Sequence, residues 1–134
     1  IKSAVIDNET RLPDYIWLAK SSPSEFSCRN LIKGKGVDFK GADLVNARLY
    51  AADLSYSNLN KANLKGASLN SSNLDNANLA GADLRGANLY RAINVTCEQI
   101  QSAMIDKDTR LPDYIQIAGS PDSTYQCKNT LKEK

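Results

Sequence analysis

The central part of the chain places a large apolar residue at every fifth position. Residues 37–96 divide into twelve units of five. The middle positions of the first eleven units are Phe39, Leu44, Leu49, Leu54, Leu59, Leu64, Leu69, Leu74, Leu79, Leu84 and Leu89. Two positions before each Leu the units carry Ala or Ser, and the other positions are rich in Asn, Asp, Ser and Gly.

Neither regular secondary structure brings these apolar side chains together. On a helix, a step of five residues rotates the side chain by about 140°, so no stripe forms. On a straight strand, an odd period sends successive side chains to opposite faces. One shared core is possible only if the chain bends within each unit, and the intervening residues are turn formers. The pattern therefore predicts stacked coils of short extended sides and corners, spaced by about 4.8 Å.

These units resemble the pentapeptide-repeat family, whose motif is a small residue, Asp or Asn, Leu or Phe, and two variable positions. Eleven consecutive units match, from VDFKG to ANLYR, and the flanks match more loosely. The resemblance implies an all-β solenoid, a right-handed quadrilateral parallel β-helix with four units per coil. Residues 37–96 would then form about three coils, closed by short helical or loop caps at both ends. The resemblance also implies a bacterial origin.

A second, longer repeat brackets the first. Residues 1–35 align without gaps with residues 100–134, at an offset of 99, and nineteen of the 35 positions are identical. We therefore predict three segments: an N-terminal flank or cap, 1–36; the β-helix, 37–96; and a C-terminal cap helix and tail, 97–134. We favour one unit of a longer tandem array; the alternative is a protein capped at both ends by related segments.

The C-terminal flank begins with a helix signal. Thr96 followed by Gln99 three residues later forms a capping box. Cys97, Ile100 and Met104 then fall on one apolar stripe. We expect residues 97–118 to cover the open end of the solenoid, because an uncovered end would expose its apolar centre. Further apolar contacts are expected from Leu111, Tyr114 and Ile115.

The three cysteines follow the offset of 99. Cys28 and Cys127 are equivalent, whereas the equivalent of Cys97 would precede residue 1. We predict a disulfide between Cys97 and Cys127, which would place this otherwise soluble chain in an oxidising compartment: periplasm, lumen or extracellular space. The alternative is three free thiols, with Cys97 as a small buried apolar residue.

Composition argues against several classes of function. The chain has no His, which removes the commonest general base and metal ligand, and we expect no enzyme, cofactor or metal site. Asp106 and Asp108, like Asp7 and Glu9, are interpreted as turn and capping residues. Seventeen basic and fifteen acidic residues give a net charge of +2, which disfavours nucleic-acid binding. No apolar run has the length of about 20 residues that a membrane span needs.

We therefore expect a structural or protein-interaction module with an unidentified protein partner. Outward positions stack every twenty residues, and Tyr beside Arg is typical of interfaces. The candidate interaction residues are Tyr50, Tyr90, Arg48, Lys65, Arg85 and Arg91. The alternative is a DNA-mimicking, gyrase-interacting protein, an activity that the family resemblance brings in. The near-neutral charge and the short rod argue against it.

Overall fold

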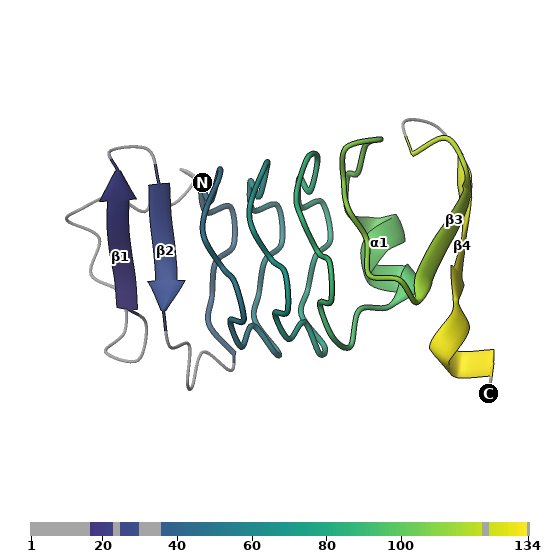
Figure 1. Cartoon of the computed structure of the whole chain (residues 1–134), viewed down its shortest axis with the longest axis horizontal. Helices are drawn as coiled ribbons and strands as arrows, with labels where there is room; N and C mark the ends of the chain where they lie inside the picture. The colour runs from purple at the N-terminus through teal and green to yellow at the C-terminus, as the bar shows by residue number, and fades with distance from the viewer. Residues whose placement is uncertain (1–16, 23–24, 30–35, 122–123, 134) are drawn as a thin grey trace.

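A computed structural model of the chain describes residues 17–22, 25–29, 36–121 and 124–133. A hairpin precedes the repeats, and a short helix, a second hairpin and a 3-10 helix follow them. Their bounds are β1 (Trp17–Ser22), β2 (Glu25–Arg29), α1 (Cys97–Ser102), β3 (Ile115–Gly119), β4 (Tyr125–Asn129) and η1 (Thr130–Glu133). Figure 1 shows the two hairpins at opposite ends of the molecule, with the repeats between them.

The repeats stack with a period of twenty residues. Parallel bridges join Asp38 to Asn58 and Asn58 to Asn78, and three further ladders run beside this one. The amide of Leu44 donates a hydrogen bond of 2.8 Å to the carbonyl of Asn63, and the central residues other than Leu79 repeat this contact. The bridges make residues 37–56, 57–76 and 77–96 successive layers, because each residue lies beside the one twenty positions later.

A tight turn separates consecutive units. The amide of Ala47 donates to the carbonyl of Leu44 at 3.0 Å, and the same i+3 to i bond recurs along the repeats. Every fifth residue from Gly41 to Arg91 has a positive φ, whether it is glycine or not. A positive φ at the third residue of such a turn defines type II. The backbone thus bends once per unit, and the bend can bring all the leucines to one side.

The core is a column of leucine surrounded by small residues. Leu54, Leu59, Leu64, Leu69, Leu74, Leu84 and Leu89 are completely buried, and so are most of the alanines two positions earlier. Every buried side-chain nitrogen or oxygen within the described residues has a hydrogen-bond partner. The apolar period seen in the sequence is therefore the packing period of the core.

The Asp or Asn that precedes most of the core leucines holds the corner, whereas Leu49 and Leu69 follow Arg48 and Ser68. The side chain of Asp38 accepts a hydrogen bond of 3.0 Å from the amide of Lys40, two residues later. Equivalent bonds form at Asp43, Asp53, Asn58, Asn63, Asn73, Asn78, Asp83 and Asn88. The side-chain oxygen accepts a hydrogen bond from an amide that has no partner in the ladder, because the backbone bends there. This favours Asp and Asn at this position.

Helix α1 starts at the predicted capping box but is shorter than predicted. The Thr96 hydroxyl accepts from the amide of Gln99, and the Gln99 side chain accepts from the amide of Thr96. The prediction that the apolar stripe of the helix extends to Met104 was wrong, because the helix ends at Ser102 and Met104 is 47% exposed. Because the backbone is extended after Ala103, side chains alternate, and Ile105 is buried in place of Met104.

The ladders continue beyond residue 96. Met104 bridges Asp83, and Arg110 bridges Asn88, at spacings of 21 and 22 residues instead of twenty. The side chains of Ile100, Ile105 and Ile115 join the leucine core, with Leu111 and Tyr114 packed against it. Residues 97–115 therefore cover the C-terminal end of the stack as an irregular further layer.

The two hairpins have the same register at the offset of 99. Leu18 pairs with Cys28 in the first hairpin, as Ile117 pairs with Cys127 in the second. Trp17–Arg29, Ala19–Ser27 and Lys20–Phe26 likewise match Gln116–Lys128, Ala118–Gln126 and Gly119–Tyr125. The repeat found in the sequence is thus repeated in the backbone. The rest of the expected N-terminal cap, including Asp7 and Glu9, lies outside the described residues.

Candidate functional site

One side of the stack carries both candidate tyrosines. It consists of residues 47–51, 67–71 and 87–91 together with Arg110, joined by the bridges Arg48–Ser68, Ser68–Asn88 and Asn88–Arg110. We call this the tyrosine face. Tyr50 is 63% exposed and Arg48 and Arg91 are exposed, whereas Tyr90 is half-buried. Four of the six candidate interaction residues therefore share one side of the solenoid.

Arg110 extends the tyrosine face and was missed by the sequence analysis. Its guanidinium carbon lies 4.0 Å from the centre of the Tyr90 ring, and that of Arg91 lies 5.3 Å from the same centre. A cation over an aromatic ring is attracted by the negative charge of the ring face. Tyr90 therefore holds two arginines from different layers close together. The sequence signal for Arg110 is its place twenty residues after Tyr90, and it can be used only if the twenty-residue period is assumed to continue through α1.

The other two candidates, Lys65 and Arg85, lie on the adjacent side. This side follows the ladder through Asp43, Asn63 and Asp83. Arg85 donates to both carboxylate oxygens of Asp83, from Nε at 2.8 Å and from Nη2 at 2.6 Å. The guanidinium of Arg85 is thus already paired within the chain. The structure separates Lys65 and Arg85 from the tyrosines by a corner of the stack.

The pairing with Arg85 changes the pKa of Asp83. The hydrogen bonds from the Arg85 side chain hold the pKa of Asp83 below its ordinary value of 3.8, while burial of the carboxylate opposes the shift. A carboxyl group with a lowered folded-state pKa stabilises the fold above its unfolded pKa. That contribution is lost as the pH falls through the lower folded pKa.

We expect Asp83→Asn to reduce the loss of stability in acid. At neutral pH the variant should be less stable by about 1 kcal/mol, because Arg85 is 44% exposed and solvent weakens the pair. Below about pH 4 the difference should shrink, since the Asp83 carboxyl of the unfolded wild type takes up a proton before that of the folded protein does. Urea unfolding at several pH values measures this. Asp43→Asn is the matched control, because Asp43 has Val45 at the position that corresponds to Arg85 and so lacks the ion pair. If the stability of the two variants changed equally with pH, the lowered pKa could not be assigned to the Asp83–Arg85 pair.

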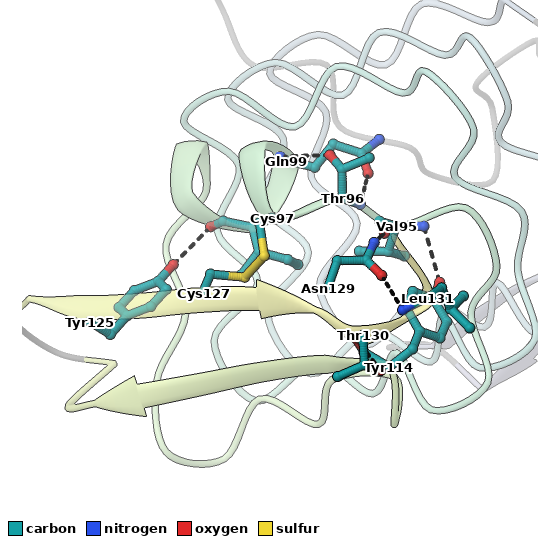
Figure 2. The surroundings of a disulfide bond; sticks show 11 residues. Val95, Thr96, Cys97, Gln99, Tyr114, Tyr125, Cys127, Asn129, Thr130 and Leu131 are labelled. Atoms are coloured by element: carbon teal, nitrogen blue, oxygen red, sulfur yellow. Dashed lines mark hydrogen bonds between the residues drawn. A yellow bond between two sulfur atoms is a disulfide. The ribbon is translucent and has the colours of Figure 1, made fainter. Parts of the chain in front are cut away.

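A disulfide joins α1 to the second hairpin. Figure 2 shows the bond between Cys97, the first residue of α1, and Cys127 in β4, with their Cα atoms 5.6 Å apart. The predicted pairing is therefore present. Beside it, the Tyr125 hydroxyl donates to the carbonyl of Ile100 at 3.1 Å. These contacts fix the hairpin onto the helix that closes the core.

The tyrosine of the duplicated RLPDYI segment fixes the same cover to the last layer. The Tyr114 hydroxyl donates to the carbonyl of Ala92 at 2.6 Å and accepts from the amide of Val95 at 3.1 Å. The amide of Thr130 donates to the carbonyl of Tyr114 at 2.8 Å. Burial of the phenol raises the pKa of Tyr114 above 10.0. This side chain therefore stays a hydroxyl at physiological pH and can keep donating.

Asp106, one of the two neighbouring aspartates of the cap, has a structural role. Asp106 Oδ1 accepts from the amides of Gly86 and Asp108, both at 3.0 Å, and from the hydroxyl of Thr109 at 3.1 Å. The predicted turn role of Asp106 is confirmed. In the part of the chain that the structure describes, no three His, Cys, Asp or Glu side chains group as metal ligands would. The same residues include no helix with the length and apolar character that crossing a bilayer requires.

Known proteins match the repeats. The family model for pentapeptide repeats matches eight copies, over residues 35–70 and 62–93. The crystal structure of alr5209, a pentapeptide repeat protein from Nostoc Pcc 7120, is 34% identical, with 61% of this chain and 67% of that chain covered and a TM-score of 0.52. The chain belongs to the pentapeptide repeat family.

A second pentapeptide repeat protein, Rfr23 from the cyanobacterium Cyanothece 51142, is 26% identical, with a TM-score of 0.32 and coverage of 69% of this chain and 67% of that chain. The comparison with curated proteins gave no match. Membership of the pentapeptide repeat family implies a right-handed quadrilateral β-helix for the repeats. The family is generally non-enzymatic and suggests a structural or protein-interaction module.

Proposed function

We propose that this pentapeptide repeat chain is a non-enzymatic protein-interaction module that binds its partner through the tyrosine face. The observation that carries the proposal is the exposure of Tyr50 on the same side as the exposed Arg48 and Arg91, on a regular surface held by backbone ladders. Tyr and Arg are enriched among residues that dominate binding energy. A surface held by backbone ladders orders few groups on binding, which favours affinity. Lys65 and Arg85 would contribute only at the rim, across the corner.

A partner pull-down with surface variants tests this role. The immobilised wild-type chain should retain a specific protein from an extract of its source organism, whereas Tyr50→Ser/Tyr90→Ser should lose it. Tyr56→Ser is the control, because Tyr56 is 52% exposed on the neighbouring side. Equal recovery by the wild type and the double variant would remove the tyrosine face from the function. The DNA-mimic alternative gains no support, and we expect no inhibition of gyrase.

We further propose that the chain is one unit of a longer tandem array. It would comprise an N-terminal flank (1–36), a right-handed β-helix of about three coils (37–96) and a C-terminal cap (97–134), with caps at both ends. The support is the common register of the two hairpins, which repeats the sequence match at the offset of 99. The disulfide supports an oxidising compartment. A full-length gene with no further copy on either side would overturn the array.

A further inference from the structure

Two arginines and one tyrosine form a cluster near the C-terminal end of the tyrosine face. The guanidinium carbons of Arg91 and Arg110 lie 5.3 and 4.0 Å from the centre of the Tyr90 ring, so they are at most about 9 Å apart. This separation is close to the Debye length of about 8 Å at physiological ionic strength. The two like charges therefore act on the same small volume of solvent and jointly attract an anion.

Within the described residues, neither arginine of the cluster forms an ion pair with a carboxylate, although Asp108 and Asp113 lie near Arg110 in the sequence. Residues 47–51, 67–71 and 87–91 contain no Asp or Glu. The guanidiniums of Arg91 and Arg110 lie over the Tyr90 ring, whereas the guanidinium of Arg85 is paired with the Asp83 carboxylate. Their planar donors are thus available for two-point contacts with an oxyanion.

Building on the proposed function, we propose that this Arg91–Tyr90–Arg110 cluster binds the carboxylates of a short acidic segment of a partner protein. Carboxylates at positions i and i+2 of an extended peptide lie about 7 Å apart along the strand, which suits two guanidiniums at most about 9 Å apart. The exposed Tyr50, two layers away, supplies an apolar contact on the same face. The partner is therefore recognised by acidic side chains next to an aromatic or aliphatic one.

One of the sides next to the tyrosine face restricts the ligand to a short segment. One neighbouring ladder begins at Asp53, with Asp75 on the same side, and the other contains Asp43 and Asp83. Asp53 and Asp75 repel a long polyanion that crosses their corner of the stack, whereas Lys65 and Arg85 offset the charge of Asp43 and Asp83 on the other side. A nucleic-acid site commonly neutralises about 6–10 phosphates, which is more than the arginines of this face provide. The acidic neighbouring side and the small number of arginines therefore favour a short acidic peptide over a nucleic acid.

The test uses defined probes and matched variants of the whole chain. The probe is a labelled eight-residue peptide of alternating Glu and Ser with one central Leu, followed by fluorescence anisotropy and by NMR of the arginine Nε–H groups. We expect resonance shifts at Arg91 and Arg110 and at least tenfold weaker binding for Arg91→Gln/Arg110→Gln. Lys40→Gln/Lys61→Gln removes the same charge from another side of the stack and should change the affinity less than twofold.

Four results overturn the inference. If Arg91→Gln/Arg110→Gln and Lys40→Gln/Lys61→Gln weaken peptide binding equally, the peptide is held only by non-specific charge attraction. If a single-stranded oligonucleotide binds more tightly than the peptide at the same salt concentration, the site is assigned to nucleic acid instead. Full affinity in Arg91→Gln/Arg110→Gln would exclude the cluster. Arg91→Lys/Arg110→Lys keeps the charge but loses the planar fork, and we expect it to bind several-fold more weakly than the wild type. If Tyr50→Ser/Tyr90→Ser loses the partner while Arg91→Gln/Arg110→Gln retains it, the proposed function stands and this inference fails.

Discussion

Replacing Leu64 with alanine is expected to lower the free energy of unfolding by about 3 kcal/mol, within the range of about 2–5 kcal/mol for buried leucines. Leu64 is completely buried in the middle layer, with Leu44 and Leu84 at the equivalent positions of the layers on either side. The Leu64 amide donates to the carbonyl of Asp83, so the ladder limits how far the backbone can move to fill the space. The cavity should therefore persist, and its cost adds to the lost burial.

Urea unfolding followed by circular dichroism measures the loss. Lys65→Ala is the control, since Lys65 is the next residue along and its side chain is exposed; its effect should stay below about 0.5 kcal/mol. A loss of less than 1 kcal/mol for Leu64→Ala would mean that the layers readjust independently. It would contradict the view that the leucine column is one continuous core.

The repeat itself could be predicted because each of its five positions has one physical role. A buried Leu, a small residue in the crowded corner, and an Asp or Asn that bonds the amide two residues later can be read from residue type alone. The structure adds the positive φ at the fifth position, which non-glycine residues such as Tyr56 and Arg91 also adopt. No sequence rule predicts these residues there, because tertiary packing imposes the conformation.

The candidate site was predicted less completely because the period changes at α1. Sequence reasoning could count twenty residues from layer to layer, and it found Tyr50 and Tyr90 in this way. Beyond α1 the spacing becomes 21 and then 22 residues, which hid the pairing of Met104 and the place of Arg110. The pairing of Arg85 with Asp83 also depends on side-chain conformation, which composition does not reveal.

The second hairpin was missed although its sequence carries a signal. Ile115 and Ile117 alternate with polar residues, as do Tyr125 and Cys127, around a segment that contains Gly119, Ser120 and Pro121. Such alternation around turn formers predicts a hairpin. The helix signal nearby drew the interpretation towards a helical cap. The hairpin is what brings Cys127 to the start of α1.

Loss of the Cys97–Cys127 bond is expected to lower the stability by about 3–4 kcal/mol. The two cysteines are separated by 30 residues, and closing a loop of that length removes about this much conformational freedom from the unfolded chain. For a chain of this size, the midpoint of thermal unfolding should fall by roughly 10 °C. Calorimetry of Cys97→Ser/Cys127→Ser, and of the wild type with and without reductant, measures the change.

Cys28→Ser is the control for this experiment, because it removes a thiol without removing the bond. It should leave the unfolding midpoint unchanged and reduce the number of titratable thiols in the oxidised protein from one to none. The hairpin keeps its hydrogen bonds from Tyr125 to Ile100 and from Asn129 to Val95, so we expect it to remain docked after reduction. If the β4 amides of the reduced protein exchange slowly, the hairpin is still docked, and the lost stability comes from the greater conformational freedom of the unfolded chain. Fast exchange would instead make the disulfide the main attachment of the hairpin, and three titratable thiols in the oxidised wild type would contradict the bond itself.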